Sequence, residues 1–228
     1  MGLNIAALLV MQKFPARRIL SLGYPDILAT KEQIEDIFGV TPQTYVPNGA
    51  WHGLKHDLPE TVEFFRMIGS QITCVDVHAS RGIETIVDLN YPHNLGALEK
   101  ELEGGFDMVI DGGTIEHCFN IAQAMMNAAN AVKHGGVIFH TTPMSMVNHG
   151  FYNVCPTLFH DFYEQNGWTV EFCQGISAKE FFPLDPVKRF LAPHECSIHF
   201  VARRTIMGEM RFPTQRKYIT NPDLKAMN

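Results

Sequence analysis

Three histidines occupy positions from which they could take a proton from a ligand. The chain has eleven histidines beside only eighteen lysines and arginines. An unperturbed imidazole titrates close to neutral pH, as a general base requires. His140 ends an apolar run, His149 lies in the loop that follows, and His117 comes directly after Glu116. We therefore predict that the base is one of these three. The alternative for each is a histidine that only hydrogen-bonds within the packed protein.

Three aspartates each stand where an apolar, strand-like run ends. They are Asp76, Asp88 and Asp111. A carboxylate at such a position is desolvated unless it accepts hydrogen bonds. Three of them at successive strand ends favour a ligand that carries hydroxyl or amine donors, such as a ribose or an α-amino group. The alternative is that each aspartate only caps the loop or helix that follows it.

A metal site is a weaker alternative for the same residues. His140 and His149 could converge with Glu116 or Asp111 as a site of two histidines and one carboxylate. The sequence has no H-x-x-x-H pair that would hold two of these ligands on one helix, and convergence of separate segments cannot be deduced from spacing. We therefore predict no metal ligands and keep a metal-dependent enzyme as the weakest hypothesis.

The elements that must position these side chains alternate between strand-like and helix-like runs. This alternation predicts a doubly wound α/β sheet of about seven strands. That the sheet is Rossmann-like, mostly parallel with an antiparallel last strand, is what the family resemblance described below implies. We expect a single domain over residues 1–206 with insertions near 40–58 and 174–195, followed by a C-terminal extension over 207–228. The strands are expected at 18–23, 71–76, 84–88, 106–111, 135–140, 169–173 and 197–203, and the main helices at 30–39, 59–69, 115–133 and 157–166.

Composition excludes several classes of partner. The net charge is −6 and the basic residues are scattered, so a nucleic-acid backbone would find no electrostatic footprint. Five cysteines without a C-x-x-C pair predict free thiols in a reducing, cytoplasmic compartment. The apolar run over residues 5–11 is far shorter than the ~20 residues that cross a membrane. We expect a small-molecule substrate, no nucleic-acid or membrane partner, and leave room for a homodimer.

Several short motifs carry a resemblance to a known family. They are Ser21-Leu-Gly23, Val75-Asp76, Asp88-Leu-Asn90, the run over residues 106–120, Gly135-Gly136, and the segments 149–153 and 156–159. Across roughly residues 18–203 the chain resembles class I S-adenosylmethionine-dependent methyltransferases, in particular a poorly characterised bacterial branch with a degenerate glycine motif. This resemblance implies S-adenosylmethionine as the cofactor and a methyltransferase-like domain over residues 1–206.

The resemblance also implies roles for individual residues. Gly23 would let the backbone approach the methionine part of the cofactor, Asp76 would bind the ribose hydroxyls, and Asp88 the adenine amine. Asp111 and Gly112 would flank the methionine moiety and the sulfonium. The remaining members of the implied cofactor-binding set are Leu22, Val77, Leu89 and Glu116. Among the predicted bases, His149 or His140 is preferred, with His117 nearer the cofactor.

The turn after the first strand departs from the family pattern. It has the sequence Leu-Gly-Tyr-Pro-Asp-Ile instead of several spaced glycines, so Tyr24 adds bulk and Pro25 fixes φ where the backbone normally contacts the ligand. Asp26 could instead bind the ammonium group of the cofactor. The other interpretation is that the turn has lost the cofactor. The absence of G-x-G-x-x-G after this strand argues against a nicotinamide enzyme.

Together these observations predict methyl transfer to oxygen or nitrogen of a small polar acceptor, a sugar or a secondary metabolite. The alternative is a non-catalytic or repurposed binding module that keeps the fold. The two insertions are expected to define the acceptor, and neither carries a motif that identifies it.

Overall fold

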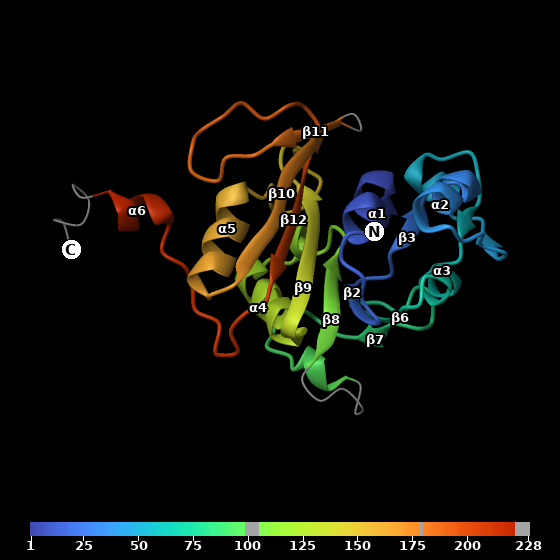
Figure 1. Ribbon diagram of the computed structural model, residues 1–228, viewed down its shortest axis with the longest axis horizontal. Coiled ribbons are helices and arrows are strands. Elements are labelled where there is room, and N and C mark those ends of the chain that lie inside the picture. Colours follow the sequence, from blue (N-terminus) through green and yellow to red (C-terminus); the bar gives the residue numbers. More distant parts are fainter. Residues whose placement is uncertain (99–104, 178–179, 222–228) are drawn as a thin grey trace.

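The apolar runs of the sequence form one mixed sheet of eight strands (Figure 1). The structure, a computed structural model, describes residues 1–98, 105–177 and 180–221. In spatial order the strands are β11 (Glu180–Pro183), β10 (Thr169–Ser177), β12 (Ser197–Arg203), β9 (Val132–Pro143), β8 (Phe106–Asp111), β2 (Arg18–Leu22), β6 (Gln71–Asp76) and β7 (Thr85–Ile86).

Five neighbouring strands, from β7 to β9, run parallel, whereas β12 runs antiparallel to both β9 and β10. The order confirms the expected doubly wound sheet with an antiparallel last strand. From β2 the chain proceeds outward to β6 and β7 and then returns to the other side of β2 to form β8. The strand order therefore reverses between β2 and β8, and a ligand of such a sheet binds at the carboxyl ends of these two strands.

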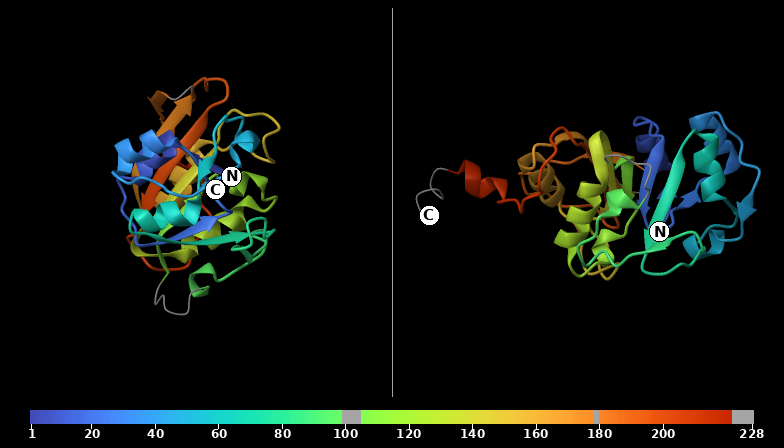
Figure 2. Two further views of the ribbon diagram at one scale, coloured as in Figure 1. Left: turned by 90° about the vertical axis from the view of Figure 1, so that its right-hand side faces the viewer. Right: turned by 90° about the horizontal axis from the view of Figure 1, so that it is seen from below.

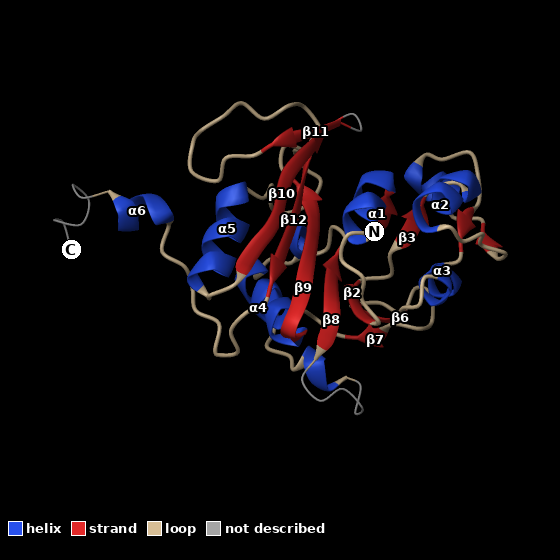
Figure 3. Ribbon diagram, in the orientation of Figure 1, coloured by secondary structure: helices blue, strands red, loops and turns tan. Residues whose placement is uncertain are grey.

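Helices cover both faces of the sheet (Figures 2 and 3). Successive side chains along each strand point to opposite faces of the sheet, so one hydrophobic core lies on each face. One face packs against α4 (Ile121–Ala131) and α5 (Pro156–Gln165), and the other against α1 (Ile5–Met11), α2 (Lys31–Phe38) and α3 (Thr61–Met67). The short helix α6 (Arg216–Thr220) lies apart from the sheet. No helix of the described ranges is long and apolar enough to cross a membrane.

Two small sheets lie beside the main one. In the first, β1 (Gly2–Asn4) pairs in parallel with β3 (Asp26–Leu28), the strand that follows the turn after β2. In the second, β4 (Tyr45–Val46) pairs with β5 (Leu58–Pro59). Within the expected 40–58 insertion, β4 and β5 enclose the 3₁₀ turn η1 (Gly49–His52). The pairing of β1 with β3 brings the beginning of the chain to the end of β2.

Local sequence signals are accurate at the start of α2. The Thr30 side chain accepts from the backbone of Gln33, whose own side chain accepts from the Thr30 backbone N–H, so the predicted capping box is present. Gly39 ends the helix with φ of +67°, a left-handed conformation that glycine adopts without steric cost.

The structure corrects three of the expected elements. The helix expected over 115–133 is broken into the 3₁₀ turn η3 (Ile115–His117) and α4, and its last residues join β9, which begins at Val132. The insertion after β10 contributes an eighth strand, β11, through antiparallel pairing with β10. The third expected strand, over 84–88, is reduced to the two residues of β7. Backbone pairing with a neighbouring strand sets the start of β9 and the positions of β11 and β7.

Candidate functional site

The turn after β2 borders a narrow space at the carboxyl ends of β2 and β8, where the strand order reverses. We call this space, which is bordered by Gly23, Gly112 and Thr114, the cradle. Gly23 has φ of +91° and donates its N–H to the Val75 carbonyl at 2.6 Å. A Cβ on Gly23 would lie 3.4 Å from the Thr114 hydroxyl and 3.5 Å from the Asp76 carboxylate. The Thr114 hydroxyl also donates to the carbonyl of Leu22. Glycine is therefore required here both for its backbone conformation and for the close approach of its neighbours.

The side chain of Met1 fills this cradle. A Cβ on Gly112 would lie 2.7 Å from the Met1 sulfur, and one on Gly23 would lie 3.1 Å from the Met1 methyl carbon. The Thr114 hydroxyl is 3.3 Å from the same sulfur. The position is maintained by the β1–β3 pairing and by the Asp26 N–H, which donates to the Met1 carbonyl at 3.2 Å. A thioether thus lies over the carboxyl ends of β2 and β8, between two glycines.

Asp76 ends β6 beside this cradle. Its Oδ1 accepts from the backbone of His78 at 3.2 Å, and Val77 between them is half exposed. Asp76 and Met1 both line a cavity of about 300 Å³, together with Tyr24, Asp26, Trp51, His52, Ser80 and Arg81. The cradle therefore opens into this polar cavity, which the Asp76 carboxylate borders.

Asp26 is already paired within the protein. Arg81 Nη2 donates to both of its carboxylate oxygens at 3.0 and 2.9 Å, and His52 Nε2 lies 2.9 Å from Oδ2. The guanidinium of Arg81 also lies over the rings of Trp51 and Tyr24, at 4.7 and 5.3 Å from their centroids. An ammonium group would have to compete with Arg81 for this carboxylate. Binding of the cofactor's ammonium group by Asp26 therefore stays a prediction, and the sequence did not reveal this competing partner.

Asp88 is partly exposed in the loop after β7. Its Oδ1 accepts from the backbone and the side chain of Asn90 at 3.0 and 2.8 Å, and these hydrogen bonds lower the pKa of the Asp88 carboxyl. The next residue, Leu89, is buried. This geometry is that of a loop cap, and binding of an adenine by Asp88 stays a prediction.

His140 is fully buried within β9, where it pairs with Asp111 at the end of β8. Its Nδ1 lies 2.7 Å from Asp111 Oδ2, its Nε2 lies 2.7 Å from the Tyr163 hydroxyl, and its ring stacks on Phe159. Both ring nitrogens are therefore engaged and no face of the ring meets solvent. His140 as a base that touches a substrate stays a prediction, and the full burial of its ring argues against that role.

Asp111 instead links the buried histidine to the strand end. While its Oδ2 contacts His140, its Oδ1 accepts from the backbone N–H groups of Thr114 and Ile115 at 2.9 and 3.2 Å. The carboxylate thus holds the start of η3 against the end of β8. Asp111 is itself fully buried, and Gly112, which is also buried, lies below the Met1 side chain.

The other two predicted bases come together around Glu116. His149 Nε2 lies 3.6 Å from Glu116 Oε1, His117 Nε2 lies 3.9 Å from it, and the two imidazole centroids are 5.2 Å apart. The histidine side chains are 46% and 49% exposed, respectively, whereas Glu116 is fully buried. Burial, with the nearby Asp111, raises the pKa of the Glu116 carboxyl to about 8, and burial with the neighbouring His149 lowers the pKa of His117.

A larger cavity lies on the same edge of the sheet. It measures about 530 Å³ and receives His52 and His56 from the first insertion, Phe181 and Glu195 from around the second, and Met146 from the loop that carries His149. His52 lines both this cavity and the one beside Asp76. Residues of or beside the two expected insertions therefore line one pocket; that this pocket defines the acceptor stays a prediction.

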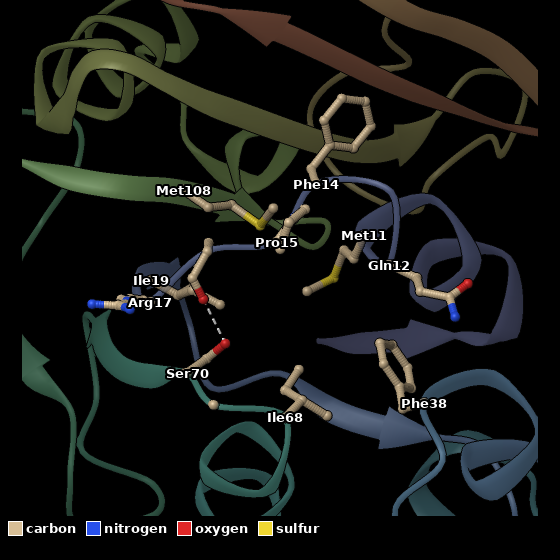
Figure 4. A pocket seen from close by; sticks show the side chains of 12 residues that line it. Met11, Gln12, Phe14, Pro15, Arg17, Ile19, Phe38, Ile68, Ser70 and Met108 are labelled. Atoms are coloured by element: carbon tan, nitrogen blue, oxygen red, sulfur yellow. Dashed lines mark hydrogen bonds between the residues drawn. The ribbon is translucent and has the colours of Figure 1, made fainter.

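A third cavity lies at the opposite edge (Figure 4). It measures about 370 Å³ and is lined mainly by apolar side chains, among them Met11, Phe14 and Ile68. Ile19 and Met108, near the amino ends of β2 and β8, also face it. Since ligands of this fold bind at the carboxyl ends of the strands, this cavity is not part of the candidate site.

Sequence reasoning missed three residues that shape the site. Thr114 follows the Asp111-Gly-Gly run and could have been found from its place at a strand end. Arg81 stands five residues beyond Asp76, but no signal pairs it with Asp26. Met1 carries no local signal at all, because only the β1–β3 pairing brings it to the cradle.

Comparison with known proteins gives distant similarities. No protein-family model matches the chain. A curated long-chain acyl-[acyl-carrier-protein] reductase from Synechococcus elongatus is 29% identical over 116 residues, which is 50% of this chain. The match spans about a third, 32%, of that protein. This similarity is too low and too partial to assign a family.

Solved structures with a similar fold include several methyltransferases. An S-adenosylmethionine-dependent methyltransferase from Archaeoglobus fulgidus is 13% identical and has a TM-score of 0.49, with 88% of this chain and 92% of that one covered. TehB from Haemophilus influenzae has 9% identity and a TM-score of 0.49, covering 87% of this chain and 62% of that one. The 1,6-didemethyltoxoflavin-N1-methyltransferase from Burkholderia thailandensis, with bound S-adenosylhomocysteine, has 15% identity and a TM-score of 0.44, with coverages of 89% and 76%. At these values the similarities assign neither a cofactor nor an activity to this chain.

Proposed function

We propose that this protein binds S-adenosylmethionine and transfers a methyl group to oxygen or nitrogen of a small polar acceptor, such as a sugar or a secondary metabolite. The observation that carries the proposal is the cradle at the switch point. Two glycines at the ends of β2 and β8 enclose a methionine thioether, and a carboxylate stands beside it at the end of β6. S-adenosylmethionine, when bound, supplies an electrophilic methyl group on a sulfonium.

The residues of the cradle fit a methionine and a ribose. The space above Gly23 and Gly112 accepts a methionine side chain, because that of Met1 already lies there. The Thr114 hydroxyl is within 3.3 Å of the sulfur position, and Asp76 can accept hydrogen bonds from ribose hydroxyls on the open side. The Met1 side chain must move for a cofactor to bind.

The acceptor is proposed to bind in the 530 Å³ cavity between the two insertions. Its lining combines apolar groups such as Phe181 and Met146 with polar ones such as His56 and Glu195, as in sites that enclose a small molecule and orient it through a few polar contacts. Alignment of the acceptor with the methyl group in a space that excludes water is the main catalytic contribution that this chain's residues can make.

Removal of a proton from the acceptor is proposed to take place at the Glu116, His117 and His149 cluster. Of the three predicted bases, the two in this cluster are half exposed and lie on the ligand edge of the sheet. His140 is proposed to support the cluster indirectly, since Asp111 joins it to η3.

The proposal is tested by titrating the protein with S-adenosylhomocysteine in a calorimeter. We expect Asp76→Asn to weaken binding by about 10- to 100-fold, the value of a hydrogen bond to a charged group. Asp36→Asn, which changes an exposed carboxylate on α2, is the matched control and should leave the affinity unchanged. Failure of the folded protein to bind either S-adenosylmethionine or S-adenosylhomocysteine would refute the proposal.

The second candidate, a non-catalytic binding module, is favoured by the same Met1 side chain, since an occupied cradle is compatible with a cofactor site that is no longer used. Methyl transfer to any member of a panel of hydroxylated and amine metabolites, abolished by Asp76→Asn, would eliminate this alternative.

A further inference from the structure

We propose that Glu116, His117 and His149 bind one divalent transition-metal ion at the carboxyl ends of the parallel strands. The inference rests on the geometry of the three side chains and is independent of whether the cradle binds a nucleoside cofactor. It changes the part proposed above for the cluster in proton removal: an imidazole nitrogen that binds the ion cannot accept a proton, and the ion would instead lower the pKa of an acceptor hydroxyl bound to it. One ligand atom from each of the three side chains lies within 4.8 Å of the others.

The first argument is an unpaired buried carboxylate. Glu116 is fully buried, and neither of its carboxylate oxygens has a hydrogen-bond partner among the described residues. A buried carboxylate without partners is costly in free energy, and most buried polar groups are hydrogen-bonded or bind an ion. Both nearby imidazoles lie at 3.6 and 3.9 Å, beyond hydrogen-bond length. A cation between these groups would supply the partner that both carboxylate oxygens of Glu116 lack.

The second argument is the spacing. Two ligand atoms that each lie about 2.1 Å from a tetrahedral zinc ion are separated by about 3.4 Å. The Glu116 to His149 and Glu116 to His117 distances, 3.6 and 3.9 Å, exceed this value by about 0.2 and 0.5 Å. Small rotations of the half-exposed imidazoles can close the difference.

The third argument is the way in which the backbone holds the ligands together. The Glu116 carbonyl accepts from the N–H groups of Phe151 and Tyr152 at 2.9 and 3.3 Å, which fastens the loop that carries His149 onto η3. A Cβ on Gly150 would lie 2.8 Å from the same carbonyl and 3.1 Å from His117 Nδ1. Only glycine permits this approach, so the loop is built to bring His149 against Glu116.

The ligand set indicates the kind of metal. Two imidazole nitrogens and one carboxylate suit zinc, iron and related transition ions, whereas magnesium and calcium prefer oxygen ligands alone. Three protein ligands leave at least one coordination position for water or an acceptor oxygen. The exposed sides of both imidazoles place that open position toward solvent.

The test uses full-length protein that has been stripped with a chelator. Titration with Zn²⁺ in a calorimeter and with Co²⁺ by visible absorption is expected to give one ion per chain. His149→Ala and Glu116→Gln should each weaken binding at least tenfold. His78→Ala, which removes an exposed histidine outside the cluster, is the control and should bind as the unaltered protein does.

Thermal unfolding separates loss of the metal from loss of the fold. Zn²⁺ at 100 times its dissociation constant should raise the melting temperature of the unaltered protein by roughly 5–10 °C. Glu116→Gln replaces an unpaired carboxylate by a neutral group of the same shape, so its melting temperature in chelator should be unchanged or higher while the response to Zn²⁺ is lost. Absence of stoichiometric binding to folded protein, or equal binding in both ligand variants, would overturn the proposal. Because the readouts are binding and melting, they remain informative if S-adenosylhomocysteine does not bind.

Discussion

Replacing Met1 by alanine is expected to tighten the binding of S-adenosylhomocysteine. If the cradle is the methionine site of the cofactor, the Met1 side chain and the cofactor compete for the space above Gly23 and Gly112. The variant can be made by releasing the chain from a cleavable N-terminal fusion, so that alanine stands at position 1 and Gly2 follows as before.

The size of the effect follows from the contacts that Met1 loses when it leaves the cradle. Full burial of a methionine side chain is worth about 1.5–3 kcal/mol. Met1 is only partly buried, so we expect it to stabilise the closed cradle by roughly 1 kcal/mol, on the lower side of that range. Relief of this competition corresponds to an affinity about fivefold higher. The same contacts are lost from the unliganded protein, whose free energy of unfolding should fall by a similar amount.

The assay is calorimetric titration of both proteins with S-adenosylhomocysteine, accompanied by urea unfolding without ligand. Met67→Ala, at a partly buried methionine on α3, is the matched control and should lower stability without changing the affinity. An affinity of the Met1→Ala protein that is equal to or weaker than that of the unaltered protein would refute the competition, and with it the identification of the cradle as a methionine site.

Three further predictions follow from the fold. Gly112→Ala places a Cβ 2.7 Å from the Met1 sulfur, so it should weaken S-adenosylhomocysteine binding at least tenfold while leaving the fold intact, as judged by calorimetry and circular dichroism. Tyr163→Phe leaves His140 Nε2 buried without its partner, the Tyr163 hydroxyl at 2.7 Å, and should lower the free energy of unfolding in urea by about 1–3 kcal/mol. An unchanged urea midpoint would contradict the buried chain of hydrogen bonds from Asp111 through His140 to Tyr163. Burial lowers the pKa of His199 to about 4. As the pH falls, the His199 side chain therefore becomes protonated in the unfolded state before it does so in the folded state. Its contribution to the free energy of unfolding is complete above pH ~6.5 and is lost toward pH 4, by about 3 kcal/mol in all. His199→Leu should therefore flatten the pH dependence of urea unfolding between pH 6.5 and 4, and an unchanged slope would show that another group is responsible.

The sequence by itself determined the features that depend on neighbouring residues. Apolar runs that end in Asp76 and Asp111 predicted strands and the edge at which they end, because strand formation and desolvation of the next polar group are local properties. The capping residues Thr30 and Gly39 predicted the start and the end of α2 for the same reason. The alternation of these elements was sufficient to predict the doubly wound sheet.

Only the tertiary structure decided which chemistry-bearing residues meet. The sequence preferred His149 or His140 as the base and placed His117 nearer the cofactor. Packing of α5 instead buries His140 against Tyr163, while the Gly150 loop brings His149 and His117 to Glu116. Met1 reaches the cradle through pairing with a strand more than twenty residues away. Such contacts depend on the relative placement of whole elements, which is set by the summed burial and hydrogen bonding of the sheet and its two cores. No spacing within a single segment encodes that placement, and this is why the candidate site could be predicted to an edge of the sheet but not to its individual contacts.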